Sequence, residues 1–161
     1  MNLLLLRQLS IISLFFGAIL GLIATIPLTF WLCILISMFW ISAFIIIYLK
    51  RNNLIGIINV REGCIFGGLI GFVAFIAFAL AFIPVSSVFG LIFKTYSLDV
   101  LSFFMSDFGS FVVLILLIIS TAGLAAMFNG FTGLITAYIY ELISGQKKDN
   151  FENNTIDFEI K

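Results

Sequence analysis

The sequence predicts an all-α membrane protein with four transmembrane helices, and three observations support this fold class. Of the 161 residues, 63% are hydrophobic and 10% are charged, and the mean hydropathy is +1.27. A soluble domain is about 45–50% apolar and about 25% charged, so this chain has too little polar surface for a water-soluble globule. Charged residues are absent from residues 8–49, 63–93 and 108–140. These stretches are continuously apolar rather than alternating, which favours helices over the strands of a barrel.

The lengths of the charge-free stretches predict how many times the chain crosses the membrane. A spanning helix needs about 20 apolar residues, so the first stretch accommodates two helices and each of the others accommodates one. Pro27 and Thr29 lie near the middle of the first stretch, where they favour a tight turn. We expect transmembrane helices near the following residues: 9–28, 30–49, 64–84 and 110–132. These helices form a membrane domain over 1–143.

The first helix is expected to remain part of the protein rather than to be cleaved as a signal peptide. Arg7 precedes an apolar run, as a signal peptide requires. The run is longer than the usual 7–15-residue apolar core of a signal, however, and no clear small-residue cleavage site precedes the second helix.

The positions of Lys and Arg predict the orientation. Of the eight Lys and Arg residues, only Lys94 falls in the loop between the third and fourth helices. Basic residues accumulate on the cytoplasmic side, so both termini are expected in the cytoplasm of a multi-pass protein of the cell membrane. Lys50, Arg51 and Arg61 are expected to contact lipid headgroups. The polar segment 144–161 is expected to be a mobile cytoplasmic tail.

Two short polar patterns flank the third helix. Asn59 and Glu62 have the spacing of a capping box, which favours a structural role for this carboxylate over a catalytic or proton-carrying one. Segment 97–108 has apolar residues at helical spacing and is expected to lie at the outer interface, as a covering helix or, alternatively, as a lid or docking surface.

Glycine spacing predicts helix-packing faces on the first and third helices. Gly17 and Gly21 are four residues apart, and Gly63, Gly67 and Gly71 form two further steps of four. Residues at this spacing share one helix face, where glycine lets a second backbone approach closely in lipid. The spacing does not distinguish a partner helix in the same chain from one in another chain.

The first and third helices are similar to each other. Residues 16–26 and 66–76 are identical at five of eleven positions. This similarity reflects either a duplication, in which case the fold is two parallel helical hairpins, or the biased composition of the chain. Over about residues 16–75 the chain has a Gly-rich helix with a proline near its end, a second helix that ends in Tyr48-Leu49-Lys50, and Val60-Arg61-Glu62-Gly63 opening a second Gly-rich helix. This layout resembles several small prokaryotic membrane-protein families of unknown function. The resemblance implies no activity.

The fourth helix carries a stripe of polar residues. Thr121, Asn129 and Thr136 lie on one face, where they form hydrogen bonds between helices or, alternatively, line a pore or a polar ligand site. The first interpretation is preferred.

No catalytic, cofactor-binding or metal-binding residue is predicted. The chain has no His, and the expected membrane core holds no acidic residue, so a nucleophile there would lack a base. The net charge of zero does not favour nucleic acid. The expected partners are the lipid bilayer and other membrane subunits or further copies of the chain. We expect a non-catalytic accessory, scaffolding or assembly subunit or a small oligomer that acts through glycine-mediated helix packing. The alternative is a small transporter or channel for a neutral or lipophilic solute.

Overall fold

The protein is helical throughout the part of the chain that the structure describes. The computed structural model describes residues 3–52, 59–93 and 108–156, and no strand occurs among them. The elements in chain order are α1 (Leu3–Ile23), α2 (Phe30–Leu35), η1 (Ile36–Trp40), α3 (Ile41–Arg51), α4 (Val60–Phe93) and α6 (Phe108–Ile156).

Four helices among the described residues are long and apolar enough to cross a membrane. They cover Leu6–Ile23, Phe30–Arg51, Val60–Phe89 and Phe108–Ile143, and the second of them joins α2, η1 and α3. The expected all-α fold with four spanning helices is therefore confirmed. The chain is a multi-pass membrane protein.

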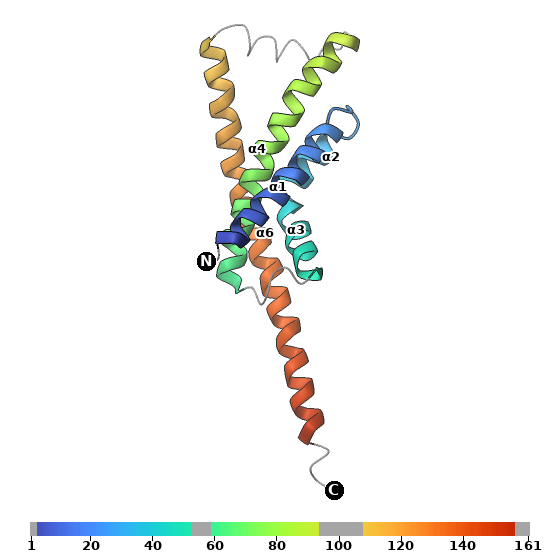
Figure 1. Ribbon diagram of the computed structural model, residues 1–161, viewed down its shortest axis with the longest axis vertical. Helices are drawn as coiled ribbons and strands as arrows, with labels where there is room; N and C mark the ends of the chain where they lie inside the picture. Colours follow the sequence, from blue (N-terminus) through green and yellow to red (C-terminus); the bar gives the residue numbers. More distant parts are fainter. Residues whose placement is uncertain (1–2, 53–58, 94–107, 157–161) are drawn as a thin grey trace.

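The helices alternate in direction and converge near the middle of the structure (Figure 1). The start of α1, the end of α3 and the start of α4 lie toward one end, which we call the basic end because Lys50, Arg51 and Arg61 are there. α4 crosses α6, and the two helices diverge on the far side of this crossing. α6 continues past the other helices at the basic end.

α1 ends at Ile23, which is earlier than the predicted end at 28. Residues 24–29 form turns instead. The Thr25 hydroxyl donates to the Leu22 carbonyl at 2.7 Å, and the Thr29 hydroxyl donates to the Ile23 carbonyl at 2.7 Å. These bonds satisfy carbonyls that a helix end leaves without partners, and so they stabilise the early termination.

α4 is longer at both ends than the predicted span at 64–84. It begins at Val60, and the Asn59 N–H donates to the Glu62 carboxylate at 3.4 Å, which is one half of the expected capping box. The helix continues through Pro84 to Phe93. A proline costs the helix its N–H bond without preventing continuation, because its fixed φ is helical.

α6 does not stop at the predicted boundary of 132, nor at the start of the segment expected to be a tail. The helix runs unbroken to Ile156. Charge and polarity mark where a chain leaves the membrane, but the helical backbone hydrogen bonding continues beyond that point. Segment 97–108 lies outside the described residues apart from Phe108, which begins α6.

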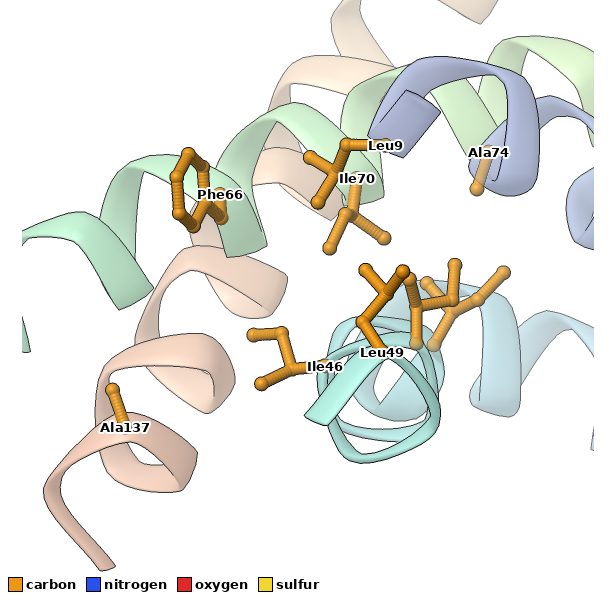
Figure 2. Packing of buried hydrophobic residues seen from close by; sticks show 9 residues of the cluster. Leu9, Ile46, Leu49, Phe66, Ile70, Ala74 and Ala137 are labelled. Carbon is orange, nitrogen blue, oxygen red and sulfur yellow. The ribbon is translucent and has the colours of Figure 1, made fainter. Parts of the chain in front are cut away.

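The main apolar core lies where all four spanning helices converge (Figure 2). Leu9 of α1, Ile46 and Leu49 of α3, and Ile70 of α4 are buried at its centre. The remaining members are Ile41, Ile45, Phe66, Ala74 and Ala137. Because Ile70 of α4 and Ala137 of α6 both belong to this core, it includes side chains from the two helices that cross.

Candidate functional site

The two glycines of α1 lie against the backbone of α4. A Cβ built on Gly17 would collide with the backbone of Ala74. A Cβ built on Gly21 would lie 2.5 Å from the Phe78 carbonyl oxygen and 3.0 Å from the Ala81 Cβ. The two helices therefore approach so closely that only glycine fits at these positions.

The three glycines of α4 lie against α6, where the two helices cross. Gly63 faces Gly133 and Ala137, and Gly67 faces the backbone of Asn129 and Gly133. A Cβ built on Gly71 would lie 2.6 Å from the Asn129 Cβ and 2.7 Å from the Ala125 carbonyl oxygen. The predicted packing glycines of both helices thus lie against helices of the same chain.

The contact between α4 and α6 is reciprocal. Gly133 of α6 is as tightly enclosed as the glycines of α4, because a Cβ built there would meet the Gly63 carbonyl and, at 2.9 Å, the Gly67 Cα. Gly68, adjacent to Gly67 but turned aside, would meet only the Ala126 carbonyl oxygen at 3.5 Å. Close approach is therefore confined to one face of each helix.

Asn129 is the most highly bonded side chain at this crossing. It is fully buried, and its Oδ1 accepts a hydrogen bond from the Ser42 N–H at 3.0 Å. Its Nδ2 donates to the carbonyls of Met38 at 2.8 Å, Ser37 at 3.0 Å and Ala125 at 3.0 Å. The Ser42 hydroxyl in turn donates to the Asn129 carbonyl at 2.9 Å. Both polar ends of the carboxamide are therefore used inside the protein.

The partners of Asn129 explain the π-helical turn η1 in the middle of the second spanning helix. In an α-helix the Ser42 N–H would donate to the Met38 carbonyl. Here the Asn129 carboxamide accepts from this N–H and donates to this carbonyl. The side chain replaces one rung of the helix ladder, as expected where an inserted group interrupts the i→i−4 pattern.

The polar stripe predicted on α6 divides into buried and partly exposed members. Thr136 is buried like Asn129, and its hydroxyl donates to the Thr132 carbonyl at 2.8 Å. Thr121 is half-buried and bonds within its own helix, to the Leu117 carbonyl at 2.7 Å. Of the three residues, Asn129 therefore bonds to another helix, whereas the hydroxyls of Thr121 and Thr136 bond within α6.

Three polar residues at the crossing were not predicted from the sequence. Ser42 binds Asn129 as described, and the Thr132 hydroxyl donates to the Phe39 carbonyl at 2.8 Å. The Ser37 hydroxyl is buried and has no hydrogen-bond partner among the described residues. Serine and threonine are common in apolar helices, so only the spacing of Thr132 from Asn129 could have indicated it.

The basic residues expected at the headgroups lie at the basic end of the structure. Lys50 is half-buried, and its Nζ lies 6.0 Å from the centroid of the Tyr140 ring. Arg51 is exposed at the last position of α3, and Arg61 is exposed in the first turn of α4. The arrangement allows contact with anionic groups at this end.

Comparison with family models, with curated proteins and with solved structures finds no match to this chain. In the described residues, no group of three or more His, Cys, Asp or Glu side chains is placed to hold a metal ion. What the crossing does is fix the four spanning helices through glycine contacts and the Asn129 hydrogen bonds.

Proposed function

We propose that this protein is a non-catalytic integral membrane protein that acts through helix packing, as an accessory, scaffolding or assembly subunit or as a small oligomer. The single observation that carries the proposal is the contrast between two segments of α6. The segment at the crossing is held against α4 by Gly133 and against the second spanning helix by the hydrogen bonds of Asn129. The outer segment, Phe108–Thr121, diverges from the remaining helices (Figure 1).

The outer segment of α6 presents most of its circumference outward. Phe111, Val113, Leu116 and Leu117 are 45–60% exposed, and they lie on more than one side of the helix. The half-buried positions recur at 110, 114, 118 and 121, which is a single face. A helix that is anchored at the crossing, and whose outer segment has few contacts among the described residues, is suited to present a preformed surface to another membrane subunit.

Gly123 supplies a place where such a subunit could approach closely. Among the described residues, a Cβ built on Gly123 meets nothing within 4 Å, in contrast to the glycines of the crossing. Since lipid provides no hydrophobic force between helices, association in a membrane depends on close backbone approach at small residues. The glycines of α1 and α4 are already used within the chain, so the proposal assigns association to α6.

The proposal is tested by measuring the mass of the purified protein in mild detergent by native mass spectrometry. Gly123→Leu is expected to abolish association with other subunits or copies, while circular dichroism shows an unchanged fold. Phe15→Leu, on the exposed surface of α1, is the matched control and is expected to leave the mass unchanged. A parent protein that is monomeric and carries no companion subunit contradicts the proposal.

A second candidate function, a small transporter or channel for a neutral or lipophilic solute, is favoured by the π-helical turn. Interrupted helices near the middle of a membrane are typical of transporter sites, and η1 is such an interruption. The complete hydrogen bonding of the Asn129 side chain favours the packing role instead. Solute flux into reconstituted vesicles that is abolished in Asn129→Ala would support transport over packing.

We also propose that both termini lie in the cytoplasm and that the membrane is the cell membrane. The support is that the start of α1 and the end of α6 lie toward the basic end (Figure 1), where Lys50, Arg51 and Arg61 are found. Basic loops are retained on the cytoplasmic side.

A further inference from the structure

A groove runs along the surface between the second spanning helix and α6. It has a volume of about 700 Å³ and is lined by η1 and α3 on one side and by α6 on the other. We call it the α3–α6 groove. Its apolar walls include Phe39, Trp40, Ile47, Phe131, Ile139 and Tyr140.

The groove matches one leaflet of a bilayer in length. On α6 its lining extends from Phe131 to Ile143. Twelve residues of helix rise about 18 Å, and half of a hydrocarbon core of about 30 Å is about 15 Å. The groove starts beside the Thr132–Phe39 hydrogen bond at the helix crossing and ends near Tyr140 at the basic end. A single acyl chain of the leaflet at that end would lie along it.

The lining of the groove suits a flexible hydrocarbon chain. Apart from Thr132 and Thr136, the lining residues are apolar or aromatic, and they come from two helices that run beside each other along the groove. An acyl chain can follow such a surface and contact hydrocarbon along its length. A helix of another subunit is the alternative occupant, and the experiment below distinguishes the two.

The polar groups in the groove do not favour a polar solute. The Thr132 hydroxyl donates to the Phe39 carbonyl at 2.8 Å and to the Phe128 carbonyl at 3.0 Å. The Thr136 hydroxyl donates to the Thr132 carbonyl at 2.8 Å. Since both hydroxyl protons are engaged within the protein, the groove offers mainly hydrocarbon contacts.

The mouth of the groove carries positive charge. Tyr140 lines the groove, and the Nζ of Lys50 lies 6.0 Å from the centroid of its ring. Arg51 follows Lys50 and is exposed. Glu141 is the exposed acidic residue that follows Tyr140, so two basic side chains and one acidic side chain flank this position. This balance favours an anionic headgroup over a zwitterionic one.

We propose that the α3–α6 groove binds an anionic phospholipid of the leaflet at the basic end. One acyl chain lies against Phe39, Trp40 and Ile139, and the phosphate contacts Lys50 and Arg51. The groove is distinct from the outer segment of α6 and Gly123, to which association is assigned, so either proposal can fail without the other.

Trp40 provides a direct probe of the site. It lines the groove and is 59% exposed, and the chain has one other tryptophan, Trp31. Trp31→Phe therefore leaves a single reporter. This variant is reconstituted into phosphatidylcholine vesicles to which a lipid with brominated acyl chains is added. The brominated lipid is phosphatidylglycerol in one series and phosphatidylcholine in the other. In each series, the quenching of Trp40 fluorescence is measured against the mole fraction of brominated lipid.

Brominated phosphatidylglycerol is expected to quench Trp40 at a lower mole fraction than brominated phosphatidylcholine. Adding Lys50→Gln or Arg51→Gln should each reduce this preference about fivefold, because one basic side chain near an anionic leaflet contributes about 1 kcal/mol. Lys50→Arg should retain it. Arg7→Gln removes a positive charge from α1, which does not line the groove, and should also retain the preference.

Three results would overturn the proposal. The first is equal quenching by the two brominated lipids. The second is a preference that survives unchanged in both Lys50→Gln and Arg51→Gln. The third is no quenching by either lipid, which would mean that protein rather than lipid covers Trp40.

Discussion

Adding one methyl group at Gly71 tests whether glycine determines the spacing of α4 and α6. In Gly71→Ala the new Cβ would start 2.6 Å from the Asn129 Cβ, and ordinary contact begins at 3.4 Å, so the helices must separate by about 0.8 Å. A gap of 0.5–1 Å forfeits a quarter to a half of the dispersion energy of each contact across it. The expected loss is about 1–3 kcal/mol of unfolding free energy, as for other overpacked sites.

The assay is equilibrium unfolding in mixed micelles, with the denaturing detergent fraction increased and helicity followed by circular dichroism. Gly68→Ala is the matched control on the same helix, because its Cβ would meet only the Ala126 carbonyl oxygen, at an ordinary 3.5 Å. Gly123→Ala, with nothing within 4 Å, is the control on α6. Both controls should be neutral or stabilising, since alanine is a better helix former than glycine by about 1 kcal/mol. Equal destabilisation in all three variants would refute the reasoning.

Three further predictions concern particular side chains. Asn129→Ala removes three side-chain hydrogen bonds to the second spanning helix, and at about 0.6 kcal/mol each the same unfolding assay should show a loss of about 2 kcal/mol. A loss confined to a few tenths of a kcal/mol would contradict this role. Glu62→Gln weakens the start of α4 and should cost under about 1 kcal/mol, because the carboxylate is exposed. In the folded protein in detergent, a maleimide should modify the exposed Cys64 well before the buried Cys33. Mass spectrometry of the labelled peptides measures the two rates. Equal rates would argue against the placement of α2, which contains Cys33.

The fold class could be predicted because charge is costly inside a bilayer. Three charge-free stretches and the turn around Pro27 were sufficient for four spanning helices. The helix ends were less accurate, because hydropathy reports the limits of the membrane rather than of the hydrogen-bonded backbone. The continuation of α6 to Ile156 and of α4 through Pro84 to Phe93 illustrate this.

The candidate site was predictable only in part, since a sequence indicates which residues share a face but not what the face meets. Spacing indicated the glycines of α1 and α4, whereas their contacts with Ala74 and Gly133 depend on how the helices cross. The π-helical turn had no local signal, because Ile36–Trp40 contains neither glycine nor proline. Its cause is Asn129, which is distant in sequence and reaches it only in the folded chain.

The most direct test of the four-span account is the location of the two chain ends in intact cells. Small epitope tags are placed before residue 1 and after residue 161, and their digestion by external protease is compared before and after the membrane is permeabilised. The account predicts that both tags are protected until the membrane is opened. One tag digested in intact cells and the other protected would mean an odd number of crossings and would contradict it.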